Sequence, residues 1–298
     1  MEMKKAVWAV AVVAAFVGGA AHAQDAGTLK KIKDTGVIAL GHRESSIPFS
    51  YYDDKQNVIG YSYEFQMKAV DAIKKKLNMP NLTVKMIPVT SQNRIPLVQN
   101  GTVDLECGST TNNAERQQQV AFSNTIFVIG TRLMTKKESG IKDFADLKGK
   151  TVVTTAGTTS ERLLRKMNQD KSLGMSIISA KDHGDSFQTL ETGRAVAFMM
   201  DDALLAGERA KSRNPGDYVI VGAPQSHEAY GCMMRKGDTE FKKVVDEAIA
   251  KTETSGEGDK IYQKWFESPI PPKSLNLAFP ESDDMKALYK GPNDKALD

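Results

Sequence analysis

The chain has 298 residues, of which 40% are hydrophobic and 26% are charged, and its formal net charge at pH 7 is +3. A chain of this length and apolar content can bury one large core or two cores of ordinary size. The small net charge argues against a strong general attraction to nucleic acid or to anionic lipid, so any preference for anions must be local.

Residues 1–23 have the pattern of a cleaved secretory signal. Two lysines precede an apolar run from Ala6 to Ala21, and the run ends in the small-x-small pattern "AHA" that signal peptidase cuts. The alternative is an N-terminal membrane anchor, but the run is shorter than a membrane-spanning helix of about 20 residues. No cysteine follows it that would carry a lipid. We therefore expect cleavage before Gln24 and a soluble protein in the periplasm.

The chain has two cysteines, Cys107 and Cys232. In an exported protein an even number of cysteines favours a disulfide, and closing so long a loop stabilises the fold by a few kcal/mol, about 2–5. The alternative is two buried free thiols. Two isolated thiols are a poor metal site, and the sequence carries no metal-binding motif, so we expect no metal and no cofactor.

Strand and helix patterns alternate through the first half of the mature chain. The predicted elements are strands over 36–41, 82–89 and 102–108 and helices over 62–77 and 93–100. The first helix has apolar residues at four-residue spacing and a lysine-rich outer face. In the second, Pro96 is tolerated because it falls in the first turn, and Gly101 ends the helix. This alternation predicts parallel βαβ units with ligand sites at the carboxyl ends of the strands.

An extended run over 127–137 breaks this rhythm, and a second βα series follows it. Its predicted elements are strands over 151–155, 176–179 and 195–201 and helices over 162–168, 185–192 and 203–211. Another extended run over 228–236 precedes two further helices. If both runs cross between two lobes, lobe 1 comprises 24–131 and 232–298, lobe 2 comprises 132–231, and the site lies in the cleft between them.

Five stretches together resemble the periplasmic amino-acid-binding proteins of ATP-driven importers, solute-binding protein family 3. They are "GHRESSIPFSYYD", "TSQNRIPLVQNGTVDLECGSTTNNAER", "GTTSE", "ISAKDHGDSF" and "AVAFMMDDALLAGERAK". The resemblance runs from about Gly36 to Ala278 and is closest to the members that bind glutamate and aspartate. It implies an α/β fold with two lobes of type II, each a mainly parallel sheet flanked by helices, joined by two crossover strands.

The resemblance also implies which residues bind the α-carboxylate and the α-amino group. Arg116 takes the α-carboxylate, for which a planar guanidinium that donates two bonds is well suited. Ser109 and Thr111 face both groups, and Thr159 faces the α-carboxylate across the cleft at the start of a helix. Asp201 takes the ammonium. The neighbouring Asp202 is expected to cap the next helix, although the two roles could be exchanged.

The side-chain carboxylate of an acidic ligand needs a second set of cations, because desolvating a charge costs several kcal/mol unless it is paired. The resemblance assigns this role to Arg43, Ser91, Arg94 and His183. His183 is expected on a loop between a strand and a helix, where it could donate to a carboxylate. A histidine on its own would more often be structural, and His42 is interpreted in that way.

The implied mechanism is binding without chemistry. An acidic amino acid docks on lobe 1, lobe 2 closes over it, and a membrane permease of an ABC importer recognises the closed shape. A monomer is expected. The alternative is a periplasmic lyase or dehydratase of the same fold acting on a carboxylated small molecule, with His183 or Asp201 as general acid or base. No set of nucleophile, base and orienting group stands out, so the sequence favours a non-enzyme.

Overall fold

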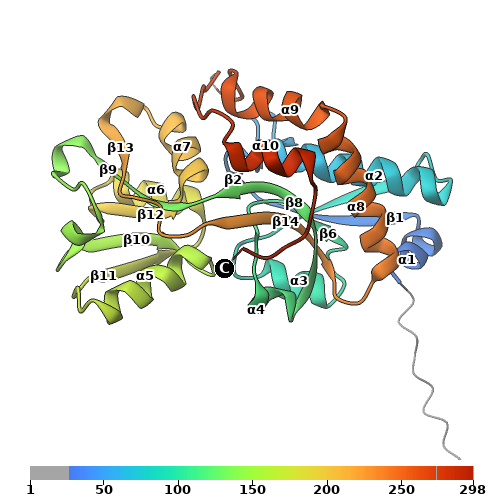
Figure 1. The fold of residues 1–298 in the computed structure, drawn as a ribbon, viewed down its shortest axis with the longest axis horizontal. Coiled ribbons are helices and arrows are strands. Elements are labelled where there is room, and N and C mark those ends of the chain that lie inside the picture. Colours follow the sequence, from blue (N-terminus) through green and yellow to red (C-terminus); the bar gives the residue numbers. More distant parts are fainter. Residues whose placement is uncertain (1–26, 273, 298) are drawn as a thin grey trace, which may run out of the picture.

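The computed structural model describes residues 27–272 and 274–297, so the predicted signal peptide lies outside the described residues. Two lobes lie side by side, each built on its own sheet, and two long extended segments connect them (Figure 1). In the described part of the chain, no helix combines the length and the apolar character that a membrane span requires.

The first sheet has the strand order β5-β1-β6-β14-β7, with β8 also paired to β14. Its strands are β1 (Val37–His42), β5 (Thr83–Pro88), β6 (Leu105–Glu106), β7 (Thr111–Asn112), β8 (Val120–Ile129) and β14 (Glu228–Arg235). Strand β1 is parallel to β5 and β6, whereas β14 is antiparallel to its neighbours. A small sheet of three strands follows β1 in the chain. Its strands are β2 (Ser45–Ser46), β3 (Ser50–Tyr52) and β4 (Val58–Ile59).

The helices of this lobe come from both ends of the described chain. They are α1 (Thr28–Thr35), α2 (Tyr61–Leu77), α3 (Arg94–Gln99), α4 (Ala114–Gln117), α8 (Thr239–Thr254), α9 (Glu257–Tyr262) and α10 (Asp283–Lys290), with a π-helical turn over Gln263–Glu267. Helix α2 buries Phe65, Ala69 and Ile73 as its periodicity predicts. Helix α3 begins at Arg94, so Pro96 falls in its first turn.

The second sheet has the order β11-β10-β12-β9-β13. Its strands are β9 (Thr131–Lys136), β10 (Thr151–Thr155), β11 (Ser176–Ala180), β12 (Ala197–Asp201) and β13 (Tyr218–Val221). Helices α5 (Thr159–Asp170), α6 (His183–Glu191) and α7 (Asp202–Lys211) and 3-10 turns over Lys137–Ser139, Phe144–Leu147 and Pro215–Asp217 complete the lobe. Strand β10 is parallel to β11 and β12, so both lobes contain the predicted parallel units.

The chain passes between the sheets twice, from β8 to β9 and from β13 to β14. These are the two predicted crossovers. The lobe boundaries expected at 131/132 and 231/232 stay a prediction; Thr131 already pairs with Asp201 in the second sheet, and β14 begins at Glu228.

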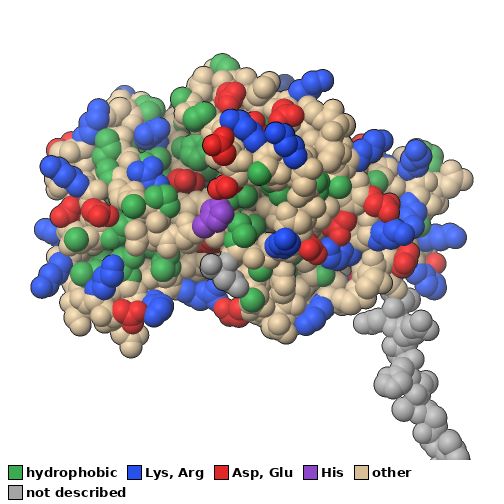
Figure 2. All heavy atoms as spheres, viewed as in Figure 1, with side chains coloured by type: hydrophobic (Ala, Val, Ile, Leu, Met, Phe, Trp, Pro, Cys, Tyr) green, Lys and Arg blue, Asp and Glu red, His purple; other side chains and the backbone are tan. Residues whose placement is uncertain are grey.

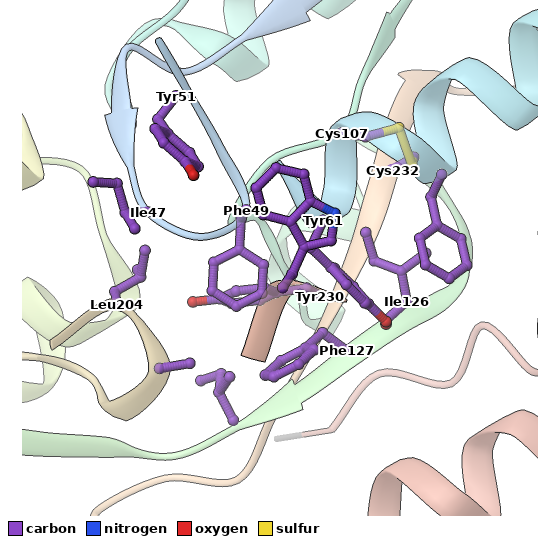
Figure 3. Close-up of a cluster of buried hydrophobic side chains, with 14 of the residues drawn as sticks. Ile47, Phe49, Tyr51, Tyr61, Cys107, Ile126, Phe127, Leu204, Tyr230 and Cys232 are labelled. Atoms are coloured by element: carbon purple, nitrogen blue, oxygen red, sulfur yellow. A yellow bond between two sulfur atoms is a disulfide. The ribbon is translucent and has the colours of Figure 1, made fainter. Parts of the chain in front are cut away.

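The largest hydrophobic core is continuous across the two lobes. Its centre is a set of aromatic rings on lobe 1 in which Phe49 contacts Phe127 and Tyr230 edge to face (Figure 3). Leu204 of α7 lies beside Ile47 in the same view. This apolar contact joins the two lobes.

The expected disulfide between Cys107 and Cys232 is present. Both cysteines are fully buried, and they join the end of β6 to the middle of β14 beside the aromatic cluster (Figure 3). The bridge closes a loop of the chain with a sequence separation of 125 that contains the whole second sheet.

Candidate ligand-binding site

The predicted site residues lie at the ends of strands and the starts of helices, on facing edges of the two lobes. Arg43, Ser91, Arg94, Ser109, Thr111 and Arg116 come from lobe 1, and Thr159, His183 and Asp201 come from lobe 2. All are buried except Thr159, which is half-buried. A buried group of arginines is costly unless anions or acceptors meet them, so their contacts define what the site can bind.

Arg94 is a buried cation at the start of α3. Its Nη1 donates to the carbonyl oxygen of Ser109 at 2.9 Å and to Oγ1 of Thr110 at 2.5 Å. Thr110 in turn donates to Glu106 at 2.8 Å, whereas Nε of Arg94 has no partner among the described residues. Burial, together with the neighbouring charges of Arg116 and Arg43, lowers the pKa of Arg94 to about 9, and the charge of Glu106 opposes this shift. Arg94 therefore lies close enough to Arg43 and to Arg116 for their charges to repel its own.

Arg43 reaches across to lobe 2. Its side chain is fully buried, with Nη1 3.4 Å from Oγ of Ser109 and Nη2 2.5 Å from Oδ1 of Asp182. Its Nε and the hydroxyl of Ser91 are buried without hydrogen-bond partners among the described residues. Unused donors next to two other arginines are suited to a carboxylate, which accepts at both oxygens.

Arg116 lies on α4, where Asn113 caps the helix by accepting from the Arg116 backbone nitrogen at 2.9 Å. Its Nη1 donates to the carbonyl oxygen of Thr111 at 2.9 Å, and its Nη2 lies 3.4 Å from the carbonyl oxygen of Gly157 on lobe 2. Burial, followed by the charge of Arg162, lowers the pKa of Arg116. This guanidinium is held by both lobes.

His183 is the first residue of α6, so the expectation that it lies on the preceding loop was wrong. Asp182 occupies the N-cap and accepts from the His183 backbone nitrogen at 2.8 Å, so the helix starts at His183 and not at the predicted Asp185. The ring Nδ1 lies 2.9 Å from Oγ of Ser46 on lobe 1. Burial and the charge of Arg43 lower the pKa of His183 to about 3, so the ring is neutral near pH 7.

Two buried acids face the arginines. Asp201 accepts from Ser160 at 3.0 Å and from Thr131 at 3.2 Å through Oδ1, and from the Tyr230 hydroxyl through Oδ2. Burial, followed by the charge of Glu228, raises the pKa of Asp201 to about 7. Glu228 accepts from hydroxyl groups at both of its oxygens.

The expected cap of α7 was wrong. The N-cap residue is Asp201, which makes no side-chain capping bond, and Asp202 is the first helical residue, whose Oδ1 accepts from the next backbone nitrogen at 2.8 Å. The carboxylate of Asp201 turns instead toward Tyr230, so packing against β14 takes it away from the helix end.

The start of α5 is capped by Thr158 and Glu161. Oγ1 of Thr158 accepts from the Glu161 backbone nitrogen at 3.0 Å, and Glu161 reaches back to the backbone nitrogen of Gly157 at 2.8 Å. Ser91, Arg116, Gly157 and Thr158 line an open pocket of about 410 Å³ at the rim of the cleft. No cluster of His, Cys, Asp or Glu with the geometry of a metal site occurs among residues 27–272 and 274–297.

The family model for bacterial extracellular solute-binding proteins, family 3, matches residues 38–268. The chain belongs to this family. The glutamate/aspartate import solute-binding protein of Salmonella typhimurium is 64% identical, and the L-glutamate/L-aspartate-binding protein of Pseudomonas aeruginosa is 62% identical. The first alignment covers 100% of both chains, and the second covers 100% of this chain and 99% of the relative.

Solved structures agree on the fold. A mutant of ArgBP from T. maritima superposes with a TM-score of 0.70 at 27% identity, over 80% of this chain and 99% of that one. Together with the two sheets and the two crossovers, this establishes the two-lobed type II architecture of the family 3 solute-binding proteins.

Three contributors to the cleft of this solute-binding protein were missed by the sequence analysis: Asp182, which pairs with Arg43; Ser46, which contacts His183; and Glu228, which gathers four hydroxyl groups. Asp182 and Ser46 stand inside two of the motifs, beside His183 and three positions after Arg43, and this nearness in sequence was their only signal. Glu228 opens the second extended run, where nothing local marks it as a cleft residue.

Proposed function

We propose that this protein captures L-glutamate or L-aspartate between its lobes in the periplasm and delivers it to the membrane permease of an ABC importer. The observation that carries the proposal is the convergence of three buried arginines, two of which have an Nε without a hydrogen-bond partner among the described residues, as has the buried hydroxyl of Ser91. The relatives from Salmonella and Pseudomonas, named for the same two amino acids, support it.

The charges of the cleft fit a ligand with two carboxylates and one ammonium. Arg116 and the start of α5 at Thr159 serve the α-carboxylate, and Asp201 serves the ammonium. Ser109 and Thr111 face both of these groups. Arg43, Ser91, Arg94 and His183 serve the side-chain carboxylate. The low pKa of His183 supports a neutral ring that can donate one hydrogen bond and adds no charge.

Lobe closure couples ligand capture to transport. Arg43 with Asp182, Ser46 with His183 and Arg116 with Gly157 are contacts between the lobes at the site itself, so they form only when the lobes approach. A ligand that bridges the same groups shifts the equilibrium toward the closed form by its extra contacts there. The permease then recognises the closed form of the protein.

The test is calorimetric titration of the mature protein, unfolded and refolded to remove carried-over ligand. Glutamate, aspartate, glutamine and a neutral amino acid are compared, and each mixture is analysed for products. Saturable binding of both acids, with the ligands recovered unchanged, supports a transport receptor. Absence of binding contradicts the proposal, and consumption of a ligand favours the lyase or dehydratase alternative. Sedimentation of the same sample tests the monomer, and its N-terminal mass tests cleavage before Gln24.

A further inference from the structure

We propose that Glu228 is a positioning residue of the ammonium subsite. Its carboxylate takes the hydroxyl hydrogens of Thr111 and Thr159, so that these two hydroxyl oxygens can only accept hydrogen bonds from the ligand. The inference rests on the proposed function and deepens it. According to this inference, Glu228 discriminates between an α-amino acid and a dicarboxylate that lacks the amine.

Glu228 is the first residue of β14, where the chain returns from lobe 2 to lobe 1, and it is 5% exposed. Its Oε2 accepts from Thr111 of β7 at 2.6 Å and from Thr159 of α5 at 2.7 Å. Its Oε1 accepts from Ser226 at 2.7 Å and lies 3.2 Å from the hydroxyl of Thr131. One carboxylate therefore joins hydroxyl groups from both lobes and both crossovers.

Counting the available hydrogens shows which group donates in each of these hydrogen bonds. A hydroxyl has one hydrogen and two lone pairs, and an ionised carboxylate only accepts. When Thr111 and Thr159 each donate to Glu228, neither has a hydrogen left for a ligand carboxylate, and each keeps a lone pair for a donor. An ammonium supplies three donors and no acceptor. The hydroxyl pair bound to Glu228 thus matches an amine and rejects an anion.

This count refines the role of Thr159. Its side chain is committed to Glu228 at 2.7 Å and cannot also donate to the α-carboxylate predicted for it. The α-carboxylate is then left to the guanidinium of Arg116 and to backbone N–H groups at the start of α5. Thr159 accordingly belongs to two subsites, through its backbone and through its hydroxyl.

A second acid strengthens the same preference. Thr131 lies 3.2 Å from both Asp201 and Glu228 and has one hydrogen for the two, so these carboxylates share a donor in a buried place. Asp202 adds to the negative field on Asp201, and Arg116 opposes it. A ligand ammonium compensates this charge, whereas a ligand without an amine leaves it uncompensated.

The experiment compares L-glutamate with glutarate, which has the same two carboxylates and no amine, by calorimetric titration of the mature protein. In Glu228→Gln, the hydroxyl hydrogens of Thr111 and Thr159 are no longer all taken up by a carboxylate. We expect glutamate affinity to fall by about tenfold or more, the range for a hydrogen bond to a charged group, while glutarate affinity stays within about twofold or rises. The charge-matched control is Glu247→Gln at an exposed position of α8, which should leave both affinities unchanged.

A second variant protects the test against misfolding. Thr159→Val keeps Glu228 and the shape of the side chain but removes one acceptor, so it should weaken glutamate severalfold and spare glutarate. Equal losses for the two ligands, or no loss in either variant, overturn the positioning role of Glu228. If the unsubstituted protein binds neither glutamate nor aspartate, the proposed function itself fails and the inference fails with it.

Discussion

The cleft has two charged walls, and they differ in how many hydrogen bonds the protein itself makes to their buried charged groups. The cation wall, Arg43, Arg94 and Arg116, keeps donors in reserve, because Nε of Arg43 and of Arg94 has no partner in the described part of the chain. The acid wall, Asp201 and Glu228, has a hydroxyl donor on every carboxylate oxygen. Both walls are buried, so the difference lies in how far the protein itself satisfies them.

The difference indicates which wall still has hydrogen-bonding groups available for the ligand. Unused guanidinium donors in a desolvated place favour an incoming carboxylate, because each new bond there removes a desolvation cost. The acids already have partners and are held rigid by them, so they act through charge and through the lone pairs of the hydroxyls they orient. The following predictions test this contrast, from the largest expected effect to the smallest.

Arg116→Ala should give the largest loss. It removes a buried cation that meets both lobes and leaves the ligand's α-carboxylate without its partner, so affinity for every amino acid tested should fall by about a thousandfold. Titration calorimetry measures the loss, and thermal unfolding of the ligand-free variant checks that the fold is retained. A loss confined to acidic ligands would show that Arg116 serves the side-chain carboxylate instead.

Glu253 on α8 tests what hydroxyl donors do for a buried acid, because neither of its carboxylate oxygens has a hydrogen-bond partner among the described residues. Burial raises its pKa from 4.5 to about 9. A folded-state pKa above the unfolded value gives stability that is complete below pH 4.5 and is lost as the pH rises through 9.

Glu253→Gln should therefore unfold with a larger free energy than the unsubstituted protein at pH 8, by a few kcal/mol, with a much smaller gain at pH 5. The difference should grow by at most about 1.4 kcal/mol per pH unit. Denaturant unfolding at the two pH values measures it, and Glu247→Gln, exposed on the same helix, is the matched control. A gain independent of pH would mean that the carboxylate is not the cause.

Arg94→Ala should change selectivity more than overall binding. Arg94 is assigned to the side-chain carboxylate, so glutamate and aspartate should lose about tenfold more affinity than glutamine and asparagine. Competitive titration of each acid against its amide gives the ratio directly. Equal losses in the two series would mean that the two carboxylate subsites of the cation wall are wrongly assigned.

Arg162→Ala should have the smallest effect. Arg162 on α5 pairs with Glu115 of α4 across the rim, but the two side chains are 49% and 65% exposed. An exposed ion pair contributes about 1 kcal/mol or less, and salt screens it. Affinity should change by less than about fivefold at low salt and not measurably at high salt. A loss of affinity that persists at high salt would mean that the exposed Arg162 also belongs to the cation wall.

The sequence was informative where the signal was local. The four-residue spacing of Phe65, Ala69 and Ile73 located α2, and both cysteines were paired correctly. The cation wall could be predicted because Arg43, Arg94 and Arg116 stand inside motifs of the recognised family; their surroundings alone did not distinguish them from surface arginines.

The acid wall could not be predicted as a whole, because its members meet only after the chain has crossed between lobes twice. Glu228 and Thr111 are separated by 117 positions in the sequence and come together through the antiparallel pairing of β14 with β7. Similarly, Asp202 was expected to cap α7, but Asp201 occupies the N-cap position and its carboxylate accepts from Tyr230, which follows much later in the chain. Local pattern carries no record of such pairings.

Strand β14 lies in the interior of the first sheet, between β6 and β7, although it comes late in the sequence. As the chain emerges from its N-terminal end, every strand of the second sheet, up to Val221, is therefore available before the strand that the first sheet needs in its interior. The middle of the chain can fold while the earlier part still waits with β6 and β7 unpaired on that side. The first lobe to be started is thus the last to be finished, and a chain cut short before Glu228 would contain one complete sheet and one that lacks its central strand.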